Sequence, residues 1–126
     1  MDTPETLIDV IDAAPAAKEG DFPAASRVLT ADGQTIVVFT FAKGQRLNDH
    51  HAPHPLTVQV IEGCLKFTVE DRDHHLKPGR VLHVPEGVVH SVHADHRDAV
   101  FLLMLLTLPI WLPGFPLAFY AATAVT

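Results

Sequence analysis

The sequence has little of what several protein classes require, and each shortage argues against one of them. A single cysteine, Cys64, excludes an internal disulfide framework and fits a reducing compartment. Lysine and arginine are scattered, and the net charge of -6 argues against a nucleic-acid partner. The opening stretch MDTPETLIDVID has acidic residues where a secretion signal has basic ones. We therefore expect a cytoplasmic protein.

Familiar catalytic motifs are missing as well: there is no Gly-x-Ser-x-Gly, no phosphate-binding glycine loop and no cysteine pair. Histidine is abundant instead, with nine in the chain. Three of them fall in one short stretch, His50-His51-Ala52-Pro53-His54-Pro55. Imidazole is a common metal ligand, which suggests a binding site, whereas a merely solvated polar loop is the alternative.

Charge disappears from the sequence after Asp98, and the remaining residues are apolar enough to raise the question of a membrane span. Three prolines, at 109, 113 and 116, would break such a helix repeatedly. We expect a core strand over 99–108 and an apolar tail over 109–126. Because exposed apolar segments usually mark an interface, we also predict a homodimer, with part of 108–120 buried between subunits or against the barrel.

The rest of the chain reads as short strands after an arm. Residues 5–17 show a helix-like pattern within an arm that we place at 1–25. Alternating apolar residues and Gly, Pro and Asp turns then predict strands over 26–30, 34–42, 56–62, 64–70, 74–77, 80–84, 88–93 and 99–108. This pattern predicts an all-β sandwich or barrel over 26–108.

Two motifs identify a family resemblance. Gly79, Pro85, Gly87 and His90 resemble the second motif of the cupin superfamily, G-x5-P-x-G-x2-H-x3-N, although Ala94 replaces its asparagine. The resemblance covers about 27–108 and implies a jelly-roll barrel, also called a double-stranded β-helix. It also implies a small-molecule ligand and a metal held by three histidines and one glutamate.

The first cupin motif, G-x5-H-x-H-x3-4-E-x6-G, is met at Gly44, His50 and Gly63. Aligned without gaps, it places Ala52 at the second histidine position and Leu56 at the glutamate position. Two of the four family ligands are therefore missing. The run PLTVQVIEG is also similar to a group of small bacterial cupins.

A replacement ligand is available in the histidine-rich stretch. His54 has the strand parity of position 52, so we predict a metal site of His50, His54 and His90 that holds a divalent ion such as Zn, Fe, Mn or Ni. His51, if it is not a ligand, is a candidate general base. Two further pairs of residues are candidates for the substrate pocket, namely Leu56 with Val58 and Gln59 with His83. For Gln59 an outward side chain is the alternative, and for His83 a hydrogen-bonded core histidine.

These features predict a cupin that binds a small molecule and a divalent metal. As an enzyme it would be a metal-dependent oxygenase, isomerase or lyase acting on a small oxygenated substrate. The alternative is a non-catalytic ligand-binding or sensor cupin that has lost its metal, as Ala52 and Leu56 suggest.

Overall fold

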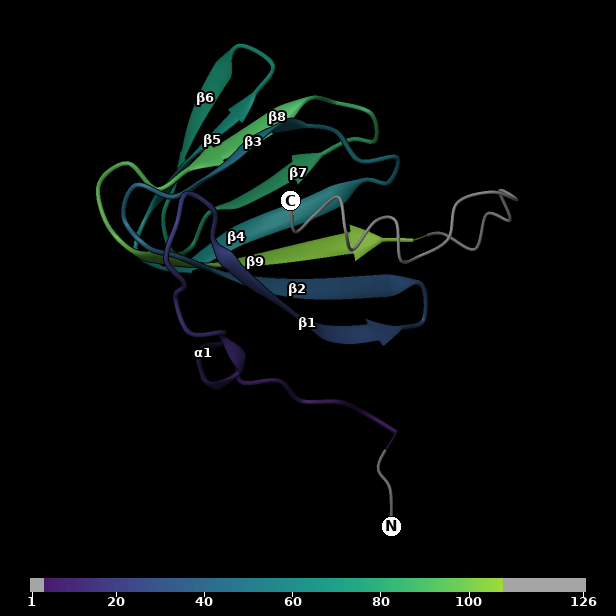
Figure 1. Ribbon diagram of the computed structural model, residues 1–126. Helices are drawn as coiled ribbons and strands as arrows, with labels where there is room; N and C mark the ends of the chain where they lie inside the picture. The colour runs from purple at the N-terminus through teal and green to yellow at the C-terminus, as the bar shows by residue number, and fades with distance from the viewer. Residues whose placement is uncertain (1–3, 108–126) are drawn as a thin grey trace.

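The computed structural model describes residues 4–107, which form two β-sheets packed face to face after an N-terminal arm (Figure 1). The arm contains one short helix, α1 (Val10–Ala13). The strands are β1 (Ala24–Ala31), β2 (Gln34–Phe41), β3 (Arg46–His50), β4 (Leu56–Glu62), β5 (Leu65–Val69), β6 (Arg72–Leu76), β7 (Val81–Val84), β8 (His90–His93) and β9 (Ala99–Leu106).

The strand order is that of a jelly roll. One sheet has the order β1-β2-β9-β4-β7 and the other has the order β3-β8-β5-β6. All pairs are antiparallel, and the chain passes to the other sheet at most of its connections. The predicted all-β jelly roll is confirmed.

Four phenylalanine side chains form the centre of the core between the sheets. Phe39 and Phe41 come from β2, Phe101 from β9 and Phe67 from the opposite sheet. Their contacting rings have centroids 5.8–6.2 Å apart, and each side chain is at most 1% exposed. Along β2, Phe39 and Phe41 are two residues apart, which is the spacing that puts side chains on the same face of a sheet.

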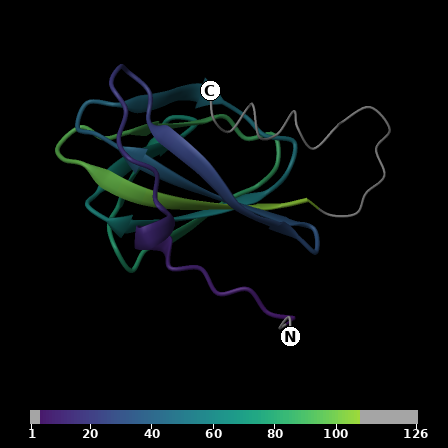
Figure 2. The ribbon, with the colours of Figure 1, turned by 60° about the horizontal axis from the view of Figure 1, so that its bottom comes forward.

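The arm has little regular structure, which corrects the helix predicted over 5–17. Only residues 10–13 are helical, capped by the Asp9 side chain, which accepts a hydrogen bond from the Asp12 N–H. Pro15 follows and disfavours helical geometry at Ala14, which is extended. Figure 2 shows the arm crossing the outside of the sheets before it enters β1. There Thr40 Oγ1 donates to the Pro15 carbonyl oxygen at 2.7 Å.

Strand β3 was not predicted, and it changes the position of His50. The sequence RLNDH is polar and only Leu47 is fully buried, so no alternation reveals a strand. His50 therefore ends a strand that comes before the one predicted over 56–62.

Two predictions about the ends of the chain remain open. Within residues 4–107 no helix is long and apolar enough to cross a membrane. The predicted tail, 109–126, lies outside the described residues, so the homodimer that depends on it stays a prediction.

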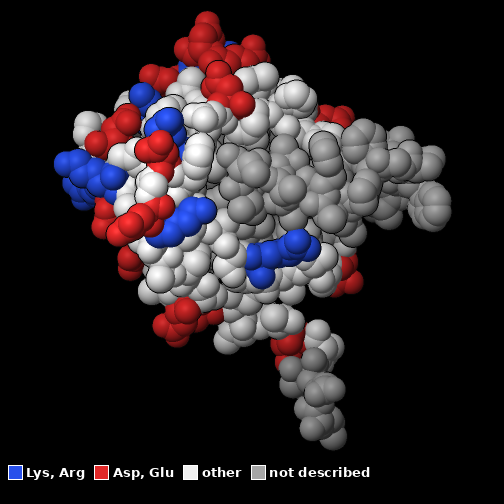
Figure 3. All heavy atoms as spheres, viewed as in Figure 1, with Lys and Arg blue, Asp and Glu red and all other residues white. Residues whose placement is uncertain are grey.

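Acidic and basic side chains are interspersed on the face seen in Figure 3, which shows no continuous basic surface among the described residues there.

Candidate functional site

The structure brings His50 and His90 together, as predicted from the spacing of the two motifs. His50 is directly opposite His90 in the antiparallel pair of β3 and β8. Their ring centroids are 4.2 Å apart and the ring planes are inclined by 66°. Strand pairing itself fixes this contact, because directly opposed residues present their side chains on the same face of the sheet.

Both imidazoles are held in the same way by the backbone. The Nδ1 of His90 lies 3.0 Å from the carbonyl oxygen of Val88, and that of His50 lies 2.7 Å from the carbonyl oxygen of Asn48. A carbonyl oxygen can only accept, so in each case Nδ1 carries the hydrogen. In the neutral ring the other nitrogen, Nε2, then has a free lone pair. This is how histidine ligands of metals are usually oriented.

His90 is the buried member of the pair. It is 2% exposed, and its ring stacks on Phe67 with centroids 5.4 Å apart and planes inclined by 16°. Burial, followed by the proximity of His50, lowers the pKa of His90 from 6.5 to about 4. His90 is therefore neutral at pH 7. Its Nε2 is buried and has no hydrogen-bond partner within residues 4–107, which is an unfavourable arrangement unless a ligand occupies that lone pair.

The loop after β3 carries the other two histidines. His51 is exposed, and its charge further lowers the pKa of His90, which places it within electrostatic reach of the pair. His54 is partly buried further along the same loop. In the described part of the chain no group of three or more His, Cys, Asp or Glu side chains is arranged to hold a metal. The structure thus brings His50 and His90 together, and the three-histidine metal site stays a prediction.

The four candidate pocket residues divide between two faces of the five-stranded sheet. Leu56 and Val58 point inward and are at most 3% exposed, within the hydrophobic core. Gln59 and His83 lie on the other face, as the alternation along β4 and its pairing with β7 require. Gln59 therefore points outward, which was the alternative considered for it. His83 is exposed, with Nδ1 3.2 Å from Thr57 Oγ1, so the core position considered for it is wrong.

Phe67 and the two backbone carbonyls that fix the imidazoles were not among the predicted site residues. Phe67 stands at an inward position of β5, two residues before Val69, which is directly opposite His90. The sequence predicted a strand over 64–70, and the alternation along β5 is the signal that could have placed Phe67 inward. The carbonyls of Asn48 and Val88 have no side-chain signature and could be found only from the folded backbone.

A family model described as "Cupin domain" matches residues 37–106, more than half of the 126-residue chain. Among curated proteins, the quercetin 2,3-dioxygenase of Bacillus subtilis (strain 168) is 41% identical over 66 residues, which is 51% of this chain. The matched part is 20% of that enzyme. The likeness therefore concerns one domain and not the whole enzyme.

Solved structures share the fold at lower identity. A conserved protein with a double-stranded β-helix domain from Klebsiella pneumoniae subsp. pneumoniae has a TM-score of 0.71 and 23% identity, covering 82% of this chain and 90% of its own. The protein TT1209 from Thermus thermophilus has a TM-score of 0.71 and 19% identity, covering 80% and 96%. DMSP lyase DddQ from Ruegeria pomeroyi DSS-3 has a TM-score of 0.65 and 18% identity, covering 76% and 54%. At these identities the likeness shows the fold alone.

Proposed function

This chain belongs to the cupin family, and we propose that it binds a divalent metal through Nε2 of His50 and His90, with a small organic ligand beside the metal. One observation carries the proposal: both Nδ1 atoms donate to backbone carbonyls, so two neighbouring rings present free Nε2 lone pairs. The Nε2 of His90, which is buried and has no hydrogen-bond partner among the described residues, supports it further. These two donors fit a metal, and a third ligand would come from the loop that carries His51 and His54.

The surroundings give each residue a separate role. Phe67 packs flat against His90 and closes the site on the core side. His50 is only partly buried, so a ligand approaches from its side of the pair. A bound divalent ion would supply a Lewis acid there for an oxygen-bearing ligand. His51, which is exposed and close, is placed to accept or donate a proton if it is not itself a ligand.

Among the reaction classes considered, oxygenase is the one that a curated relative supports. The 66-residue match is with an enzyme named as a dioxygenase of quercetin. We therefore propose oxygen-dependent conversion of a small oxygenated compound as the first activity to test, by following oxygen uptake with the metal-loaded protein. The isomerase and lyase alternatives have no support of this kind.

A second candidate function is non-catalytic binding. At the position where the family has its glutamate ligand, this chain has Leu56, whose side chain is 3% exposed and packed in the core. A carboxylate is therefore missing both as a ligand and as a proton acceptor at that place. This favours a binding module, which would hold a small molecule without turning it over.

Elemental analysis of protein produced without a histidine tag tests the metal proposal. We expect near-stoichiometric metal in the wild type and severe loss in His50→Ala and His90→Ala. His83→Ala is the matched control, because that side chain is exposed on the other face of the sheet. Wild-type protein that stays metal-free in supplemented medium, or His90→Ala at full occupancy, would refute the metal site. Metal without oxygen uptake would refute the oxygenase and favour the binding module.

A further inference from the structure

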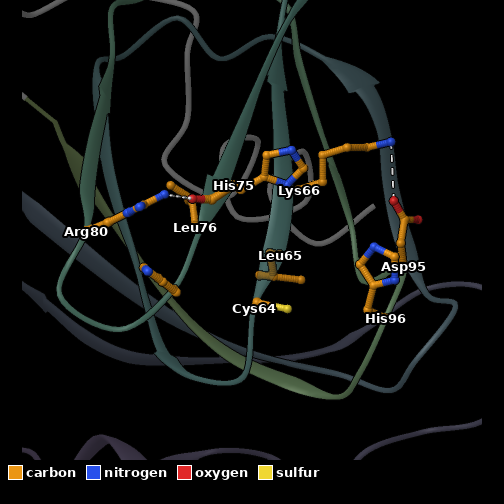
Figure 4. Close-up of a pocket in the computed structure, with 9 residues that line it drawn as sticks. Cys64, Leu65, Lys66, His75, Leu76, Arg80, Asp95 and His96 are labelled. Carbon is orange, nitrogen blue, oxygen red and sulfur yellow. Dashed lines mark hydrogen bonds and ion pairs between the residues drawn. The ribbon is translucent and has the colours of Figure 1, made fainter.

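A pocket lies in the sheet that carries His90, at the end away from the histidine pair. It has a volume of about 230 Å³ and is shown in Figure 4. Its apolar lining consists of Cys64, Leu65 and Leu76, and the other lining residues are charged or histidine. In β5, Val69 is opposite His90, whereas Lys66, at the pocket, is opposite His93. Three residues of strand, roughly 10 Å, therefore separate this pocket from the level of the histidine pair.

The charge of this pocket is opposite to that of the protein. The chain has a net charge of -6, yet the lining contains Lys66, Lys77 and Arg80 and one carboxylate, Asp95. Histidines at 75 and 96 complete the polar part of the lining. The pocket thus concentrates positive charge, which focuses the field inside a concave surface.

Two of the three cations are not neutralised by a carboxylate. Lys66 forms an ion pair with Asp95, with Nζ and Oδ2 3.2 Å apart (Figure 4). In residues 4–107 neither Lys77 nor Arg80 forms an ion pair. Arg80 is instead held by the backbone, because its Nη1 donates to the carbonyl oxygen of His75 at 2.9 Å. Its other N–H groups remain available to a ligand.

We propose that this pocket binds a small organic anion that carries a carboxylate or a phosphate. Arg80 and Lys77 would pair with the anionic group, and guanidinium matches both groups in geometry. Leu65 and Leu76, at most 3% exposed, offer apolar contact to its carbon part. This site is separate from the proposed metal centre and does not depend on it.

The single cysteine provides a reporter, because Cys64 lines this pocket and is partly exposed. We would measure its alkylation rate with iodoacetate, an anion, and with iodoacetamide, which is neutral. A cationic pocket favours the anionic reagent. In Arg80→Gln and in Lys77→Gln we expect the ratio of the two rates to fall roughly two- to fivefold, the effect of one screened surface charge. Arg72→Gln, an exposed cation at the start of β6 outside the lining, is the matched control and should leave the ratio unchanged.

Ligand protection completes the test. Citrate and inorganic phosphate, added separately, should slow alkylation of the wild type by iodoacetamide more than potassium chloride of equal ionic strength does. The better of the two identifies the anionic group. This protection should be weaker in Arg80→Gln and Lys77→Gln but not in Arg72→Gln. An unchanged rate ratio in both pocket variants, or equal protection by chloride, would overturn the proposal.

Discussion

The N–H of Gly87 donates to the carbonyl oxygen of Ala52 at 2.8 Å, joining two segments that are far apart in sequence. Gly87 belongs to the turn that leads into β8 and therefore to His90. Ala52 lies in the loop between β3 and β4 that carries His51 and His54. The bond holds this loop beside the strand of the buried histidine. The position of the loop relative to His50 and His90 is thus set by tertiary structure.

The first prediction concerns the third metal ligand. Because His51 acts electrostatically on His90, we expect His51→Ala to weaken zinc binding more than His54→Ala does. The loss should be at least about tenfold, the lower end of what removing even a supporting group costs a metal site. Competition titration against a fluorescent zinc chelator measures both affinities. A larger loss in His54→Ala would instead support the ligand set predicted from the sequence.

The second prediction is a pH dependence of stability in metal-free protein. The pKa of His90 is lowered from 6.5 to about 4 by burial and by His50. Between these values the unfolded chain binds the proton and the folded chain does not, so stability is lost as the pH falls from 6.5 towards 4. Over this whole range, protonation of His90 lowers the free energy of unfolding by about 3 kcal/mol.

Urea unfolding in EDTA, near pH 7 and near pH 4.5, tests this dependence. His90→Gln cannot gain the proton, so its free energy of unfolding should fall less between the two conditions than that of the wild type. The two proteins differ at position 90 alone, so the difference between their losses reports on the proton that His90 gains. If both proteins lose the same free energy of unfolding between the two pH values, protonation of His90 does not cause the loss of stability.

Most of the fold was accessible from sequence because its strands alternate. Along β2, for example, Phe39 and Phe41 face the core with Thr40 between them on the other face, and turn residues bound the strand. The alternation fails for β3, where Leu47 alone is fully buried among polar neighbours. That strand forms because β8 offers it a partner, and one strand's composition cannot reveal a partner.

The candidate site was also predictable in part: the sequence indicated the histidine pair but not the positions of the other residues. His90 follows a Pro-x-Gly turn at a fixed spacing, and His50 closes the equivalent spacing after Gly44, so their pairing could be inferred. The parity argument for His54 assumes a strand, whereas His54 lies in a loop that the bond between Gly87 and Ala52 holds in place. The exposed position of His83 was missed because β7 is an edge strand of apolar composition whose outward face carries Val81 and His83.

The third prediction concerns Gly63, the glycine that ends the first cupin motif. Its φ is +80°, and a Cβ there would collide with the carbonyl oxygen of Asp98. Gly79 is the matched control, with φ of +98° but no atom within 4 Å of a Cβ. Gly79→Ala should cost about 1–2 kcal/mol of unfolding free energy from backbone strain. Gly63→Ala adds overpacking of about 1–3 kcal/mol. If urea unfolding shows equal losses for Gly63→Ala and Gly79→Ala, the close approach to Asp98 does not add to the cost of a Cβ at position 63.

The last prediction concerns Gln45, which anchors the arm from inside the protein. Gln45 is 3% exposed; its Oε1 accepts from the Ala42 N–H at 2.8 Å. Its Nε2 donates to the carbonyl oxygens of Lys18 and Gly20 at 2.7 and 3.1 Å. Gln45→Met keeps the length of the side chain but removes all three bonds, and should cost about 2–4 kcal/mol, since buried backbone groups lose their partner.

The location of that loss distinguishes an anchor from an ordinary core residue. If Gln45 holds the arm, Gln45→Met should be cut by trypsin after Lys18 faster than the wild type, under conditions where the folded sheets resist. Gln34→Met, at an exposed glutamine that begins β2, is the control and should leave cleavage at Lys18 unchanged. A destabilised Gln45→Met protein with wild-type cleavage at Lys18 would mean that its bonds stabilise the turn at Ala42 and not the arm.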